Sequence, residues 1–185
     1  MASNNVNLGI GLATGMFYTA TAGTALPAYP SDSTGLSSWT EVGAVTADGI
    51  TWSTGKDSDP LRNWAKEVER LIASDEGGTV QAPLMYTTEK TLNAIFGADN
   101  VTVTAADSNH GALVSVTVAP GVSASPAGFL FIMKDGDDML MLGTSKGIVR
   151  DVDDIAFSPT EAITWTATIE AASWTFMKDD GQVTS

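Results

Sequence analysis

Apolar and polar residues alternate along Ile163-Thr164-Trp165-Thr166-Ala167-Thr168-Ile169. Successive side chains of a β-strand point to opposite faces, so this alternation predicts a strand with one apolar face and one threonine face. Threonine suits such a surface because its branched side chain is already restricted at χ1. The same rhythm occurs in residues 112–118 (ALVSVTV), 101–104 (VTVT) and, more briefly, 50–53 (ITWS). The chain is therefore expected to be mainly β.

Two further segments are apolar at every position, residues 129–133 (FLFIM) and 139–142 (MLML). Such continuous runs are typical of strands that are covered on both faces. The sequence Asp135-Gly136-Asp137-Asp138 lies between them and favours a tight turn. The two runs are therefore predicted to form a hairpin.

One amphipathic helix is predicted after residue 87. Thr87 or Thr88 can cap its start, Glu89 places a negative charge in its first turn, and Gly97 can end it. Its apolar positions are Leu92, Ile95 and Phe96. Many short strands with a single helix indicate two packed antiparallel sheets, a β-sandwich or barrel, with one flanking α-helix.

The pattern of residues 59–73 is ambiguous. Asp59 can cap a helix that begins at Pro60, and the apolar residues that follow have helical spacing. Within residues 68–72, however, Val68, Arg70 and Ile72 alternate with their neighbours as in a strand. The local pattern favours the helix.

Composition bounds the possible functions. The chain has 185 residues, 43% of them hydrophobic and 17% charged, which predicts one folded globular domain. It contains no cysteine, which excludes disulfides and thiolate metal sites. Residues 1–5 carry no cationic region typical of a secretion signal, and the apolar run 128–133 is too short to cross a bilayer. A soluble protein made in the cytoplasm, without membrane insertion, is expected.

The net charge of −13 argues against a protein that binds nucleic acid by neutralising phosphates, which needs clustered Lys and Arg. It is compatible with a surface that DNA passes without binding, although composition alone favours an ordinary solvated surface. Four of the nine basic residues lie between residues 56 and 70 beside four acids, so that this segment is neutral. The other 18 acids and 5 bases account for the whole net charge.

No constellation of residues predicts catalysis, a metal site or a cofactor. His110 is the only histidine and lies in a run of turn-forming residues, so neither a catalytic triad nor a zinc site can be assembled. Residues 135–138 and 151–154 are acidic, but they lack the spacing of a calcium loop and are interpreted as solvated turns. The five tryptophans are interpreted as core and interface anchors, although a sugar-binding platform is an alternative.

Four segments form a recognisable series along the chain: residues 15–20 (GMFYTA), 42–53 (VGAVTADGITWS), 59–64 (DPLRNW) and the helix 88–97 (TEKTLNAIFG). In this order they resemble the major tail tube proteins of long-tailed (siphovirus-type) bacteriophages. The resemblance extends over most of residues 14–175. It implies the tail tube fold: two packed antiparallel sheets with a flanking helix, in a single domain spanning residues 1–185.

The resemblance also implies a structural role in the virion tail rather than an enzymatic one. Six copies would form a ring, and rings would stack into a tube around the tape-measure protein and later the genomic DNA, which passes without specific binding. Tail terminator and distal tail proteins would contact the two ends of the tube, and assembly would take place in the host cytoplasm.

By the same analogy, residues 54–65 are assigned to a loop that stacks one ring on the next, and residues 66–74 to a strand. Residues 1–12 would be an N-terminal arm and residues 175–185 a C-terminal tail. Mixed charges suit a contact that must fix the register between subunits. The candidate inter-subunit contacts are Lys56, Asp57, Asp59, Arg62, Trp64, Lys66, Glu67, Glu69 and Arg70.

Two alternatives remain at this point. The inner tube of a contractile tail or injection system shares the fold. A carbohydrate-binding β-sandwich would instead use the tryptophans as a platform and remain monomeric.

Overall fold

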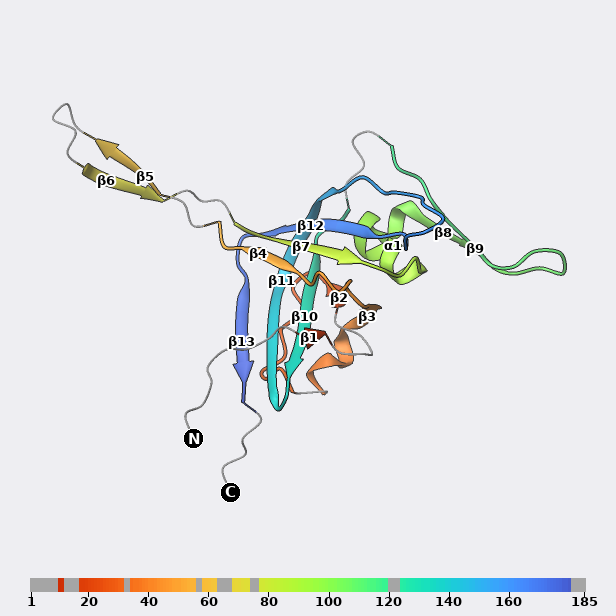
Figure 1. Ribbon diagram of the computed structural model, residues 1–185, viewed down its shortest axis with the longest axis horizontal. Coiled ribbons are helices and arrows are strands. Elements are labelled where there is room, and N and C mark those ends of the chain that lie inside the picture. The colour runs from red at the N-terminus through yellow and green to blue at the C-terminus, as the bar shows by residue number, and fades with distance from the viewer. Residues whose placement is uncertain are drawn as a thin grey trace, which may run out of the picture.

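The computed structural model describes residues 10–11, 17–31, 34–55, 58–62, 68–73, 77–119 and 124–180. Its main feature is one nine-stranded antiparallel sheet (Figure 1). The strands of this sheet are β1 (Ile10–Gly11), β2 (Phe17–Thr21), β3 (Thr40–Gly43), β4 (Thr51–Ser53), β7 (Gly78–Leu84), β10 (Ala127–Asp135), β11 (Asp138–Val152), β12 (Trp165–Ala171) and β13 (Thr175–Asp179).

The sheet folds back on itself at β11, a strand of 15 residues. The strand order is β3-β2-β10-β11-β12-β7-β4, with β1 added beside β10 and β13 beside β11. The first part of β11 pairs with β10 and β13, and its last part, residues 148–152, pairs with β12. One bulge lies between these parts, where Thr144 and Gly147 of β11 pair with Phe129 and Ala127, and a second lies within the last part, between Val149 and Asp151. A bulge bends a strand and increases its twist, which lets the two halves of the sheet face each other.

Backbone contacts close the gap between the two ends of the folded sheet. Val45, just after β3, pairs with Leu84 of β7, and the Thr46 N–H donates to the Pro83 carbonyl at 2.8 Å. The predicted mainly β sandwich or barrel with one flanking helix is confirmed. The two sheets expected from the sequence are the two halves of one continuous sheet.

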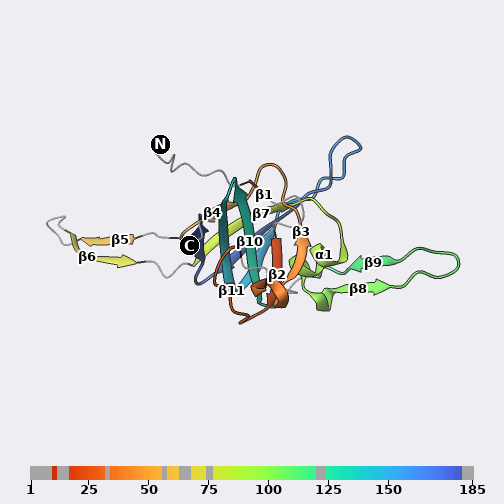
Figure 2. The same ribbon diagram turned by 90° about the horizontal axis from the view of Figure 1, so that it is seen from below.

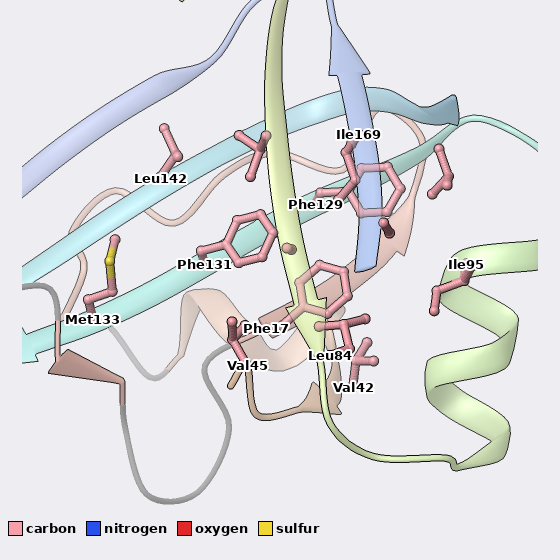
Figure 3. Packing of buried hydrophobic residues seen from close by; sticks show 14 of the residues in the cluster. Phe17, Val42, Val45, Leu84, Ile95, Phe129, Phe131, Met133, Leu142 and Ile169 are labelled. Carbon is pink, nitrogen blue, oxygen red and sulfur yellow. The ribbon is translucent and has the colours of Figure 1, made fainter. Parts of the chain in front are cut away.

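The core lies between these halves (Figure 3). Phe17 of β2 stacks on Phe131 with ring centroids 4.8 Å apart, and on Phe129 at 6.1 Å. Leu84 and Ile169 face these rings from the other half, each 1% exposed. Apolar side chains from both halves thus fill one common interior.

A second cluster covers the opposite face of β10 and β11. Leu130, Ile132 and Met141 alternate with the residues of the main core and contact Trp39, which is 7% exposed. Trp39 follows a short 3-10 helix, η1 (Gly35–Ser38), and approaches Gly128 so closely that a Cβ there would lie 3.0 Å from its ring. The prediction that this hairpin is covered on both faces is confirmed, and Gly136 forms its turn at φ +60°.

The predicted helix is α1 (Glu89–Phe96). Thr88 is its N-cap, because its hydroxyl oxygen accepts from the Thr91 N–H at 3.2 Å. Ile95 is buried in the main core, and Phe96 meets Trp165 edge-on at 5.9 Å. A second short 3-10 helix, η2 (Ala98–Asn100), follows. None of the helices in the described parts of the chain is long and apolar enough to span a membrane.

Residues 58–73 differ from the sequence-based expectations. They contain two strands, β5 (Ser58–Arg62) and β6 (Val68–Ala73), that pair antiparallel as a separate hairpin. The helix favoured by the local pattern is wrong, and so is the loop over residues 58–62, whereas the strand expected within residues 66–74 is confirmed for residues 68–73. Pairing with β6 outweighs the helical spacing, and Pro60 is tolerated because neither strand of a two-stranded hairpin is flanked on both sides.

The expected arm and tail also contribute strands. Residues 175–179, assigned to a C-terminal tail, form β13 and pair with the start of β11, so that Met177 lies opposite Met141. Ile10 and Gly11, assigned to an N-terminal arm, pair with the end of β10. The other residues of that arm, 1–9 and 12, lie outside the described residues, as does the tail after residue 180.

The stacked phenylalanines provide a test of the core. Phe131→Ala should lower the free energy of unfolding by about 3–5 kcal/mol, because it removes a fully buried ring and leaves a cavity. Chemical denaturation of the purified chain measures this loss. Phe157→Ala is the matched control: this side chain is 77% exposed, so the change should stay within about 0.5 kcal/mol. Equal losses for the two variants would contradict the assignment of the core.

Candidate functional site: surfaces for assembly

Two hairpins project from opposite ends of the molecule (Figures 1 and 2). The first, called here the β5–β6 arm, is formed by residues 58–62 and 68–73. The second, called here the β8–β9 ribbon, is formed by β8 (Val101–Thr104) and β9 (Leu113–Val116). Each hairpin is a two-stranded sheet of its own. An isolated hairpin of this kind is at best marginally stable in water, which favours a contact with another molecule.

The structure brings part of the predicted contact residues together on the β5–β6 arm. Asp59 and Arg62 lie on β5, and Glu69 and Arg70 lie on β6, where Arg70 is opposite Leu61. The remaining candidates lie outside the described residues: Lys56, Asp57, Trp64, Lys66 and Glu67. The four placed residues combine two acids and two bases on one projecting element.

An exposed aromatic pair lies where this arm leaves the body. Trp52 of β4 stacks on Phe176 of β13, with ring centroids 6.5 Å apart and the planes inclined by 21°. The two side chains are 38% and 52% exposed. We call this pair the Trp52–Phe176 patch. It joins two edge strands that belong to different halves of the sheet.

Trp174 packs behind this patch. Its indole N–H donates to the Gly78 carbonyl at 2.8 Å, and a Cβ at Gly78 would lie 2.9 Å from the Trp174 ring. A shallow cavity of about 280 Å³ opens beside these side chains. Its lining contains no charged residue and consists of Trp52, Thr54, Gly77, Gly78, Ala172, Ser173 and Trp174.

Trp39 and Trp165 lie elsewhere, and the indole N–H of each donates a hydrogen bond within the chain. Trp39 covers the second cluster and donates to the Ala25 carbonyl at 3.3 Å. Trp165 donates to the Thr87 hydroxyl at 2.9 Å. Among the residues that the structure describes, Trp52 is thus the one tryptophan that is more than a third exposed, so these tryptophans do not form a platform of several rings.

A polar face covers one half of the sheet, formed by β4, β7, β12 and the end of β11. Its residues alternate with the buried Val80, Ala82, Ala167 and Ile169. Its polar residues are Thr51, Ser53, Thr79, Gln81, Thr166, Thr168, Glu170 and Asp151, and the registers place Pro83 and Ile148 on the same face. We call this surface the threonine-rich face.

Acidic groups are held across this face. The Gln81 amide donates to Asp153 at 3.2 Å across the intervening β12, so Asp153 lies over the same surface. Arg150 forms an ion pair with Glu170 at 3.1 Å. With Asp151, three acids and one paired base give this surface a negative charge.

The half-sheet below this face has two open edges. Among the described strands, β4 pairs with β7 alone, and residues 148–152 of β11 pair with β12 alone. These edges lie on opposite sides of the same four strands. Unpaired backbone donors and acceptors at a sheet edge form a template for pairing with another chain.

The sequence model of the phage tail tube protein family matches residues 1–180. The chain belongs to this family. A comparison with curated proteins gives no match. Tail tube proteins are structural components of the bacteriophage tail, so the surfaces that matter in this chain are those for assembly. The family assignment favours this interpretation over a carbohydrate-binding module.

The structure of this tail tube protein reveals two surfaces that sequence reasoning missed. The alternation in residues 101–104 and 112–118 predicts strands, but it does not indicate that they leave the body as a ribbon. Phe176 was assigned to a tail, so its stacking on Trp52 was not anticipated. The sequence feature that could have indicated the ribbon is the absence of charged residues from 111 to 133, a range that includes β9.

His110 lies at the tip of the ribbon of this tail tube protein and forms no catalytic arrangement. Its ring nitrogen Nδ1 is 3.2 Å from the Asp107 carboxylate, and both side chains are exposed. The pKa of Asp107 is lowered by hydrogen bonds that its carboxylate accepts. The backbone N–H of Asn109 has the largest effect, the backbone N–H of His110 the next, and the His110 ring the smallest of the three. No cluster of three or more acidic or histidine side chains suited to a metal ion occurs in the described ranges.

The turn at Asp107 provides a second prediction. Because its folded pKa is lowered, the carboxylate stabilises the turn above the ordinary pKa of aspartate, and this stabilisation is lost as the pH falls through the lowered value. His110→Ala should raise the pKa of Asp107 only in part, because the two backbone hydrogen bonds remain. Titration of the Asp107 carboxyl by NMR measures this. A full return to the ordinary value would show that the histidine ring is the main cause.

Proposed function

We propose that this tail tube protein forms hexameric rings that stack into the hollow tube of a non-contractile phage tail, the conduit for DNA ejection. The observation that carries the proposal is the four-stranded half-sheet with two open edges and a polar outer face. Family membership supports the structural role in the tail, and the arrangement of these strands supports the mode of assembly.

The two open edges are suited to each other. If β4 of one copy pairs with residues 148–152 of the next, the half-sheets of neighbouring copies join into one continuous sheet. A contact between two different surfaces, repeated around an axis, closes into a ring. Closure also removes the sheet edges that would otherwise invite uncontrolled aggregation. Six copies is the number that the resemblance to long-tailed phages implies.

In this arrangement the threonine-rich face lines the lumen. Most of its side chains are short and polar, and its one base, Arg150, is paired with Glu170 at 3.1 Å. The carboxylates of Asp151 and Asp153 repel the phosphates of DNA, which would let the genome slide through without binding. The same lumen would hold the tape-measure protein before ejection.

Stacking of rings is assigned to the β5–β6 arm. The arm leaves the half-sheet between β4 and β7 and projects away from the body (Figure 1). Its acids and bases would fix the register against the neighbouring ring. Tail terminator and distal tail proteins would cap the two ends of the tube. An inner tube of a contractile tail would use the same surfaces, and a sheath in micrographs of the virion would distinguish it.

Negative-stain microscopy of the concentrated full chain tests the assembly. Hollow tubes or rings with six-fold symmetry are expected. Rings with another symmetry would contradict the hexamer. Should virion tails contain a tube built from a different protein, the structural role itself would be refuted.

Removing charge from the lumen tests the conduit. Phages carrying Asp151→Asn and Asp153→Asn should eject their DNA more slowly than wild type, because phosphate meets a less repulsive wall. Tail length should not change, because Asp→Asn leaves the backbone donors and acceptors of the strand edges in place, including those at Asp151 itself. The matched control carries Asp99→Asn and Asp137→Asn, which remove the same charge away from the threonine-rich face. Dye-based ejection kinetics compare the phages, and equal rates for the two double variants would remove the electrostatic argument.

A further inference from the structure

We propose that the β8–β9 ribbon of one copy docks through a valine face on the Trp52–Phe176 patch of a second copy. The inference rests on the proposed self-assembly and adds a contact that is separate from the strand edges and the β5–β6 arm. The partner is a second copy of this chain.

The ribbon has one apolar face. Its cross-strand pairs are Val101 with Val116, Thr102 with Ser115, Val103 with Val114, and Thr104 with Leu113. Paired residues of an antiparallel hairpin point to the same side, so the four valines form one face and the hydroxyl residues with Leu113 form the other. Val103 is 45% exposed. None of the four valines belongs to either hydrophobic cluster of the described residues.

The distribution of charge along the chain indicates that the partner is a second copy. Two copies of a chain with net charge −13 repel each other wherever their acids approach. From residue 100 to residue 133 the only acid is Asp107, and there is no Lys or Arg. The cavity beside the Trp52–Phe176 patch is likewise lined without charge. The strands of the ribbon and the cavity beside the patch carry no carboxylate, so identical acidic copies can meet there without this repulsion.

Position completes the argument. The ribbon projects at one end of the molecule, whereas β4 and β13, which carry Trp52 and Phe176, lie toward the other (Figures 1 and 2). A ribbon therefore cannot reach the patch of its own chain. Two complementary surfaces at opposite ends produce a head-to-tail contact, which closes into a ring when the rotation between copies allows it. Exposed aromatic anchors are the side chains that most often dominate such contacts.

Substitution of a ribbon valine tests the contact. Val103→Asp should weaken the association of soluble copies at least ~10-fold, because it places a carboxylate in an apolar contact. Thr102→Asp is the matched control, with the same charge on the same strand but on the opposite face, and it should associate like wild type. Sedimentation velocity over a concentration series measures association. Both variants should melt as wild type does, since the ribbon lies outside the core. Equal association of the two variants would overturn the proposal.

Disulfide trapping identifies the partner surface directly, because the chain contains no cysteine. Copies with Val103→Cys mixed with copies with Phe176→Cys should form a covalent dimer under mild oxidation. Each variant alone, and Thr102→Cys mixed with Phe176→Cys, should form markedly less. A yield that is the same for Val103→Cys and Thr102→Cys would refute the valine face.

The outcomes also separate this contact from the proposed function. Tubes formed equally well by Val103→Asp and wild type would overturn the docking and leave the tube intact. If Val103→Cys and Phe176→Cys copies give the trapped dimer while the wild-type chain never builds a tube, the docking is supported and the proposed function is removed.

Discussion

The structure depends on the pairing of one long strand, β11, with partners from both halves of the sheet. Its first part is held by β10 and β13, and its last part by β12. A bulge at residues 144–147, opposite Phe129 and Ala127, separates these two parts, and a second bulge between Val149 and Asp151 bends the last part further. Without this bend the nine strands would form an open sheet, with the phenylalanines of β2 and β10 facing solvent. With it, they face Leu84 and Ile169 across a common core.

The same fold determines where the molecule can meet another. The bridge between Val45 and Leu84 covers part of the edge of β7. Among the described strands, β4 and the end of β11 still have a partner on one side only. Burial of the inner face leaves the outer face of this half-sheet for threonine and acids. The open edges and the polar face thus have the same cause, because the sheet closes over its core along only part of its length.

Sequence reasoning succeeded where the signal is local. The helix α1 was predicted with its cap because Thr88, Glu89 and Gly97 act within a few residues of one another. The doubly covered hairpin followed from its continuous apolar runs. The prediction for residues 58–62 failed because Pro60 and the helical spacing after it resemble the start of a helix. The pairing of these residues with β6 leaves no signal within the segment itself. Alternation in the ribbon predicted strands, but periodicity does not specify what covers the apolar face. Trp64 and the other candidates outside the described residues stay predictions.

The uneven distribution of charge links these features to assembly. Acids gather at both ends of β11, at residues 135–138 and 151–154, while the ribbon strands and the lining of the cavity beside Trp52 carry none. At physiological ionic strength the repulsion is screened beyond about 8 Å, so it acts only on close approach. A copy arriving in a wrong orientation would bring carboxylates together and be rejected, whereas an approach through uncharged surfaces meets no such penalty. The negative charge thereby keeps the free subunit soluble and also restricts which contacts can form.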